Sequence, residues 1–140
     1  MDPSRIFFEQ DLQEIDRILD KMIAALYSSG ITSEKLKEDV LIRSMISNET
    51  VNSIALLRPS LNASGNNSFS FMRLAEPIVQ ENERIEAVIL LTFCEPKFLD
   101  YLNVMEYLFN FIQDKEKARK ILAVSNFDSL KELLVGRSES

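Results

Sequence analysis

The stretch Arg84–Phe93 constrains the fold more than any other part of the sequence. Its ten residues, RIEAVILLTF, are rich in β-branched side chains and almost continuously apolar toward the end. Such a run is typical of a central strand that is buried on both faces, because a strand with one face in water alternates apolar and polar residues. We therefore expect a sheet that other elements cover on both sides.

Two further segments have the pattern of strands. Ser53–Leu57 is short and apolar. In Phe69–Leu74 the residue types alternate with a period of two, as expected when successive side chains point to opposite faces of a strand. Pro77 and the stretch Gln80–Glu83 then predict a turn before the central strand. The three strands lie together in the middle of the chain.

Helical patterns precede and follow the strands. Apolar residues recur at three- and four-residue steps in several segments, and capping residues separate these segments. The predicted helices cover residues 12–26, 34–46, 98–112, 115–124 and a last stretch that Ser125 or Asn126 caps and that ends near Gly136. The resulting order, α-α-β-β-β-α-α-α, predicts an α/β fold with a mixed sheet flanked by helices.

Chain length and charge limit the organisation of the protein and its partners. The chain has 140 residues, the size of one domain, so we predict a single domain over residues 1–140. Its net charge of −6 opposes binding to phosphate backbones, so we expect no direct contact of this domain with nucleic acid. The longest apolar run is too short to span a bilayer, no signal peptide is recognisable, and Cys94 is the only cysteine. We predict a cytoplasmic protein without membrane contact.

The absence of histidine removes several kinds of chemistry at once. With no His in the chain, the commonest general base and the commonest metal ligand are missing. Catalysis by Ser-His-Asp or Cys-His groups is excluded, and a zinc ion would have only carboxylates and one thiol as ligands. We predict no catalytic residue, no metal site and no cofactor.

Taken in order, several segments resemble the enzyme IIA domains of the fructose/mannitol class in the bacterial sugar phosphotransferase system. These segments are LYSSGI, DVLIRS, FSFMRLAEPI, ERIEAVILLTFCEP, FLDYLNVMEYLFNFIQDKEKARKIL and FDSLKELL. None is specific alone, but together they cover nearly the whole chain at the right spacing. The resemblance implies the same sandwich of a mixed sheet between helical layers.

The resemblance also implies where a phosphorylation site would lie. In this family a His after the short apolar strand accepts a phosphoryl group from the phosphocarrier protein and passes it to an enzyme IIB domain. If Thr50 and Pro59 match the family's Thr and Pro, Ser60 stands at the acceptor position. If Asn52 and the following apolar residues are matched instead, Arg58 stands there.

Two more features of the family's site differ in this sequence. The position of a second, assisting His early in the long helix falls on Phe98, and the family's glycine-rich turn is replaced by Val51, Asn52 and Ser53. A phosphohistidine relay therefore has no acceptor here. We predict that Arg58, Pro59, Ser60 and Phe98 form a vestigial phosphorylation-site region.

The missing histidines lead to a functional prediction. We expect a degenerate, non-enzymatic relative that acts by protein contact, like the enzyme IIA-like domains at the end of some bacterial transcription activators and antiterminators of sugar metabolism. Its partner would be an enzyme IIB-like or other regulator domain, in the same longer chain or in another one, with a homodimer as a further option. Two alternatives stay open: an active phosphocarrier with a non-histidine acceptor such as Ser60, and an unrelated small α/β binding or oligomerisation protein.

Overall fold

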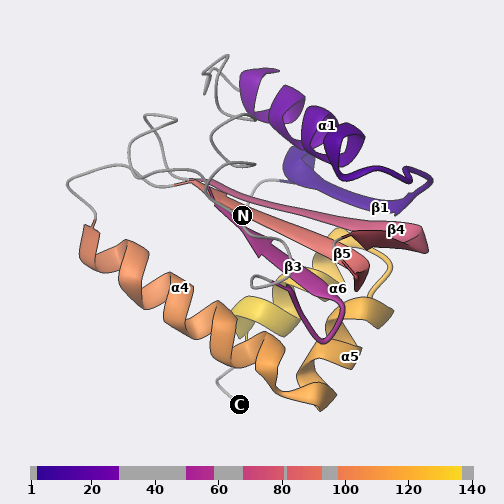
Figure 1. Ribbon diagram of the computed structural model, residues 1–140. Helices are drawn as coiled ribbons and strands as arrows, with labels where there is room; N and C mark the ends of the chain where they lie inside the picture. The colour runs from indigo at the N-terminus through magenta and orange to yellow at the C-terminus, as the bar shows by residue number, and fades with distance from the viewer. Residues whose placement is uncertain (1–2, 29–49, 59–67, 81, 93–97, 137–140) are drawn as a thin grey trace.

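The protein is a layered α/β structure with a mixed sheet in the middle (Figure 1). The computed structural model describes residues 3–28, 50–58, 68–80, 82–92 and 98–136. The elements, in chain order, are the 3-10 turn η1 (Pro3–Arg5), β1 (Ile6–Gln10), α1 (Ile15–Ser28), β2 (Thr50–Val51), β3 (Ile54–Leu57), β4 (Ser68–Gln80), β5 (Glu83–Thr92), α4 (Phe98–Gln113), α5 (Lys115–Ala123), α6 (Phe127–Lys131) and the π-helical turn η2 (Glu132–Gly136). The predicted fold class is confirmed.

The sheet has the strand order β1-β4-β5-β3-β2 within the described ranges. β4 and β5 are antiparallel neighbours, whereas β3 runs parallel to β5, and β1 runs parallel to β4. β5 is thus the central strand, as its apolar composition predicts: residues 87–92 are all buried. Because β3 and β5 are parallel, both of them end on the same side of the molecule.

The sheet separates two hydrophobic clusters. One cluster lies between the sheet and α1, where Ile18, Leu19 and Met22 are fully buried against Leu57 and Val88. Leucine, isoleucine and methionine at these helical steps place one apolar stripe of α1 on the sheet.

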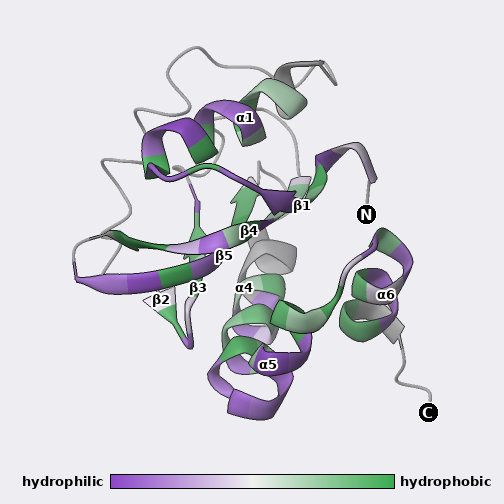
Figure 2. Cartoon of the chain, turned by 90° about the vertical axis from the view of Figure 1, so that its right-hand side faces the viewer, coloured by the Kyte–Doolittle hydropathy of each residue, from purple (hydrophilic) through white to green (hydrophobic). Residues whose placement is uncertain are grey.

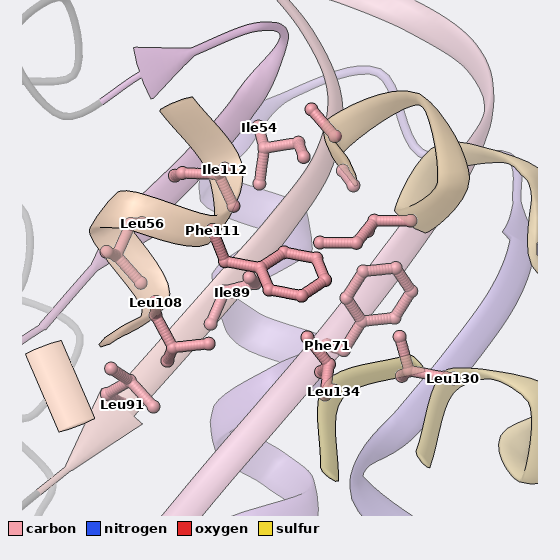
Figure 3. Packing of buried hydrophobic residues seen from close by; sticks show 13 residues of the cluster. Ile54, Leu56, Phe71, Ile89, Leu91, Leu108, Phe111, Ile112, Leu130 and Leu134 are labelled. Carbon is pink, nitrogen blue, oxygen red and sulfur yellow. The ribbon is translucent and has the colours of Figure 1, made fainter. Parts of the chain in front are cut away.

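The other cluster fills the opposite face of the sheet, between the strands and the C-terminal helices. Figure 3 shows Phe111 and Ile112 of α4 near Ile89 of the central strand, and Leu130 and Leu134 beside Phe71 of β4. Four consecutive elements, α4, α5, α6 and η2, contribute to this cluster, whereas among the described residues the helical part of the first cluster comes from α1. The C-terminal third of the chain therefore forms one layer of the sandwich.

The first strand was not predicted from the sequence. The segment Ile6–Gln10 pairs in parallel with β4, with Ile6 opposite Phe71 and Phe7 opposite Met72. Its isoleucine and two phenylalanines suit a strand, but the apolar run is short and ends at Glu9, which has a φ of 54° at a shift in the register. Only the partner strand, distant in sequence, identifies this segment as β1.

The predicted turn is confirmed at Gln80–Glu83 but not at Pro77. β4 continues through Pro77 to Gln80 and pairs there with Glu83 of β5. Pro77 lies where the register between β4 and β5 shifts, between Arg73 and Ile78, and beyond Leu74, the last β4 residue that pairs with β1. A missing N–H is tolerated at such a place, and the chain reverses instead at Asn82, with a φ of 67°.

The C-terminal helices agree with the predicted pattern. Asp114 Oδ1 accepts hydrogen bonds from the backbone N–H groups of Glu116 and Lys117, and Asn126 Oδ1 accepts one from Ser129. Both residues are therefore N-caps, as predicted. The predicted helix over 34–46 lies outside the described residues. No helix in the described part of the chain is long and apolar enough to cross a membrane.

Candidate functional site

The turn before the candidate site contains no glycine, although both of its central residues have positive φ. β2 and β3 form a hairpin in which Val51 pairs with Ile54, and the two residues between them, Asn52 and Ser53, have φ angles of 52° and 71°. A two-residue turn of type I′ requires positive φ at both positions, and asparagine tolerates this conformation better than most residues. The replacement of the family's glycines therefore leaves a turn in place.

The side chain of Asn52 fixes this hairpin to the end of α4. Its Nδ2 donates hydrogen bonds to the carbonyl oxygens of Ile112 at 2.7 Å and Gln113 at 3.2 Å. The last carbonyls of a helix have no partners within the helix, so Asn52 satisfies two of them. The backbone carbonyl of Ser53 accepts from the N–H of Glu86 at 2.8 Å, which joins the hairpin to β5. Asn52 thus positions α4 and β3 relative to each other.

The other end of β3 carries the predicted site. Leu57 pairs with Leu90, and Arg58 follows it as a half-buried residue. Thr92, at the end of β5, is fully buried, and its hydroxyl lies 2.5 Å from that of Ser68 at the start of β4. We refer to this end of the strands, with Arg58, Thr92 and Ser68, as the carboxyl edge of β3 and β5.

The structure describes only part of the predicted site. Arg58 lies at the carboxyl edge, Pro59 and Ser60 lie outside the described residues, and Phe98 is the first residue of α4. Figure 1 shows that α4 begins on the side of the molecule where β3 and β5 end. Phe98, at the start of α4, and Arg58, directly after β3, therefore lie on the same side of the molecule, and the side chain of Phe98 is not described.

Sequence reasoning missed the hydroxyl groups at the carboxyl edge. Ser68 and Thr92 are direct partners on antiparallel strands, and Ser70, two residues along β4, is fully buried. Their positions depend on the register between β4 and β5, which the sequence alone does not give. The alternating pattern of Phe69–Leu74 was the available signal, because it places Ser68 and Ser70 on one face.

The comparison with protein families decides the relationship of this chain. Residues 1–136 match the family of EIIA 2 domains of the phosphoenolpyruvate-dependent sugar phosphotransferase system. The chain belongs to this family. The match excludes the alternative that the protein is an unrelated α/β protein.

Solved structures of EIIA proteins share the fold of this family member. The nitrogen regulatory protein IIA-Ntr from Neisseria meningitidis has a TM-score of 0.80 at 16% identity, covering 96% of this chain and 95% of its own. The mannitol IIA from Escherichia coli has a TM-score of 0.75 at 16% identity, with coverages of 96% and 99%. The same score, at 17% identity and 98% of each chain, is found for a complex of enzyme IIAMTL with phosphorylated enzyme IIBMTL from Escherichia coli. Among curated protein sequences none matches this chain.

The prediction that this chain is a degenerate relative, and not a phosphotransferase component, is contradicted. The EIIA family to which it belongs consists of phosphotransferase-system components, and the match extends over 136 residues. The prediction inferred a lost function from missing residue types. At one of these differences, the turn without glycine, Asn52 and Ser53 still adopt positive φ and form a turn. The lack of histidine removes one kind of phosphoryl acceptor but does not remove the chain from the family.

Proposed function

We propose that this EIIA-type domain works by docking on an EIIB-type domain through the carboxyl edge of β3 and β5. The observation that carries the proposal is the family match over residues 1–136, together with the shared fold of an EIIA protein that has been solved in complex with its phosphorylated EIIB partner. The docking surface would include Arg58, Pro59, Ser60 and Phe98. The partner domain lies either in the same longer chain or in a separate protein.

Arg58 is the residue we propose as the main contact. Its guanidinium is planar and always charged, and it presents several N–H donors in a fixed geometry that matches carboxylates and phosphoryl groups. It lies at the carboxyl edge, half-buried, so the neighbouring chain already limits its side chain. A contact made by Arg58 therefore loses less conformational entropy than one made by a fully exposed arginine.

The context we propose is the regulation of sugar metabolism, within or alongside a bacterial transcriptional regulator. The domain would report the state of the EIIB-type partner to the regulator by binding it. A phosphorylated partner carries additional negative charge, which Arg58 would bind more tightly than the unphosphorylated form. The domain is expected to act in the cytoplasm, without direct contact to nucleic acid.

The experiment is a binding measurement with variants. EIIB-type domains of the source organism, phosphorylated and unphosphorylated, are titrated into the protein by calorimetry. Arg58→Ala is expected to weaken binding about tenfold, the size of one charge-assisted contact. The matched control is Arg84→Ala, an exposed arginine on β5 near the β4–β5 turn. Equal affinities of the Arg58 variant and the unchanged protein would contradict the proposed surface.

A second candidate function is favoured by membership in a family of phosphotransferase components. The chain would then accept a phosphoryl group on Ser60. Its hydroxyl oxygen would form a bond to phosphorus while the bond between phosphorus and the donor protein's phosphorylated residue breaks, and the hydroxyl proton would pass to the released donor residue or to solvent. Incubation with phosphoenolpyruvate, enzyme I and the phosphocarrier protein, followed by mass spectrometry, tests this function. Phosphoserine at residue 60 that is lost in Ser60→Ala supports it, and an unmodified chain excludes it.

A further inference from the structure

A cleft lies between the β2–β3 hairpin and α5, at the end of β3 away from the carboxyl edge. Its volume is about 500 Å³, and it is lined by Asn52 and Ser53 of the hairpin, Glu86 of β5, and Lys115, Arg119 and Leu122 of α5. Figure 1 shows the hairpin beside α5, far from the start of α4. The cleft therefore differs in position from the surface of the proposed function.

The walls of this cleft are fixed by hydrogen bonds. Asn52 is held on the last carbonyls of α4, and the carbonyl of Ser53 accepts from the N–H groups of Glu86 at 2.8 Å and Ala87 at 3.3 Å. On the other side, Arg73 of β4 donates from its Nη1 to the carbonyls of Leu122, at 3.1 Å, and Val124, which anchors the end of α5. A ligand would bind to a preformed site, so little conformational entropy would be lost in ordering the site.

The charge of α5 is opposite to that of the protein as a whole. Residues 115–120 contain four basic side chains and one acidic one, a net charge of +3. The rest of the chain therefore carries −9, the difference between the total of −6 and this value. Figure 2 shows hydrophilic residues concentrated at the start of α5.

Two of the basic residues line the cleft, one helical turn apart. The side chain of Lys115 makes no ion pair or hydrogen bond with another residue in the described part of the chain. Arg119 Nη1 lies 2.7 Å from Glu116 Oε1, but both side chains are largely exposed, with 70% and 67% of their surface accessible. Such an exposed pair is weak and exchanges readily for a better carboxylate. Both cations are thus available to a ligand.

The floor of the cleft is apolar. Ala118 is buried between Lys115 and Arg119, and Leu122 and Ala123 continue the surface toward the end of α5. An apolar floor beside two cations fits a peptide segment with carboxylates next to a medium-sized apolar side chain. A nucleic acid fits less well, because it extends well beyond the cleft and would bring further phosphates against the negative charge on the rest of the protein, whereas a short acidic segment stays beside α5.

We propose that this cleft binds an acidic protein segment whose carboxylates pair with Lys115 and Arg119 and whose apolar side chain packs on Ala118 and Leu122. The segment belongs to a partner protein, since charge complementarity with α5 is what selects it. This contact is independent of the EIIB-type contact at the carboxyl edge. The domain would have two docking surfaces, one at each end of β3.

The experiment uses the 140-residue chain labelled with ¹⁵N and the acetylated, amidated peptide Glu-Leu-Glu-Glu-Leu as the probe. Saturable shifts of the amide signals of Asn52, Ser53 and residues 115–122 are expected, and the peptide with glutamine in place of glutamate should give none. Binding should weaken as salt is raised, because the contact is partly exposed. Peptide-induced shifts that lie elsewhere, or no shift at millimolar peptide, would overturn the proposal.

Variants distinguish binding of the peptide in the cleft from a general attraction of the peptide to positive charge on the protein. Lys115→Glu combined with Arg119→Glu should weaken the peptide about tenfold, whereas Lys131→Glu, an exposed lysine on α6 away from the cleft, should leave its affinity within about twofold. A glutamate at position 115 is in the first turn of α5, where negative charge favours the helix, whereas one at 119 adds a like charge near Glu116. Circular dichroism therefore checks that lost binding is not lost folding. Equal losses in both variants, or an RNA dodecamer that moves the cleft amides while the peptide does not, would refute the proposal.

Discussion

β3 is only four residues long, yet its two ends depend on the sequence in different ways. The hairpin end needs a backbone conformation, positive φ at two positions, and Asn52 and Ser53 supply it without glycine. Phosphoryl transfer to a histidine at the carboxyl edge would need a particular atom, an imidazole nitrogen, and this chain has no histidine to supply it. A departure from the family pattern thus has little consequence at the first end and changes the chemistry at the second.

This difference explains why the missing residues misled the functional prediction. Three differences from the family were given the same weight, although one of them is a substitution that keeps the turn. The family match depends on residues 1–136 together, including the buried strands next to both ends of β3. Conformational and chemical positions should be weighed separately.

The largest expected effect is a loss of stability that involves both ends of β3 together. Leu56 lies in the middle of the strand, buried in the cluster under α4 and labelled in Figure 3. Leu56→Ala should lower the free energy of unfolding by about 3 kcal/mol, through lost burial and the cavity it leaves. Urea denaturation followed by circular dichroism measures the change. A loss below about 1 kcal/mol would mean that β3 does not anchor the two ends.

The next effect isolates the hairpin end. Asn52→Ala removes two hydrogen bonds to α4 and places a Cβ without side-chain compensation at positive φ, so we expect a loss of about 2 kcal/mol. Asn52→Gly removes the same bonds but accepts the conformation, so it should lose about 1 kcal/mol. Equal losses in the two variants, measured by the same denaturation, would show that the positive φ at residue 52 has no energetic cost.

A smaller effect of opposite sign is expected near the carboxyl edge. Ser70 is fully buried opposite Leu90, and its hydroxyl has no hydrogen-bond partner among the described residues. Ser70→Ala removes this polar group and should raise the free energy of unfolding by about 1 kcal/mol. Thermal denaturation provides the measurement. A destabilised variant would indicate that the hydroxyl is hydrogen-bonded in solution.

The smallest effect concerns the cleft at the hairpin end. Glu116→Gln removes the exposed partner of Arg119 and should change stability by less than about 0.5 kcal/mol. It frees the guanidinium, so the acidic peptide should bind about twofold more tightly. Fluorescence anisotropy with a labelled peptide compares the two proteins. Weaker binding would mean that Glu116 holds Arg119 in the orientation that the peptide needs.

Much of the fold could be predicted from local patterns. The apolar run of β5, the stripe of α1 and the caps Asp114 and Asn126 all act through neighbours along the chain, and the structure agrees with them. β1 and the passage of β4 through Pro77 could not be predicted, because both depend on which strand lies alongside. The same holds for the hydroxyl pair of Ser68 and Thr92, and for the cleft beside α5, which joins residues from three separate elements.

The central claim is that the carboxyl edge docks an EIIB-type domain, and amide shift mapping tests it most directly. The ¹⁵N-labelled protein is titrated with each EIIB-type domain of the source organism, in its phosphorylated and unphosphorylated forms. We predict shifts at Arg58 and Thr92, larger with a phosphorylated partner, and unchanged signals at Asn52 and Ser53. Shifts confined to the hairpin end, or no binding to any of these domains, would contradict the account.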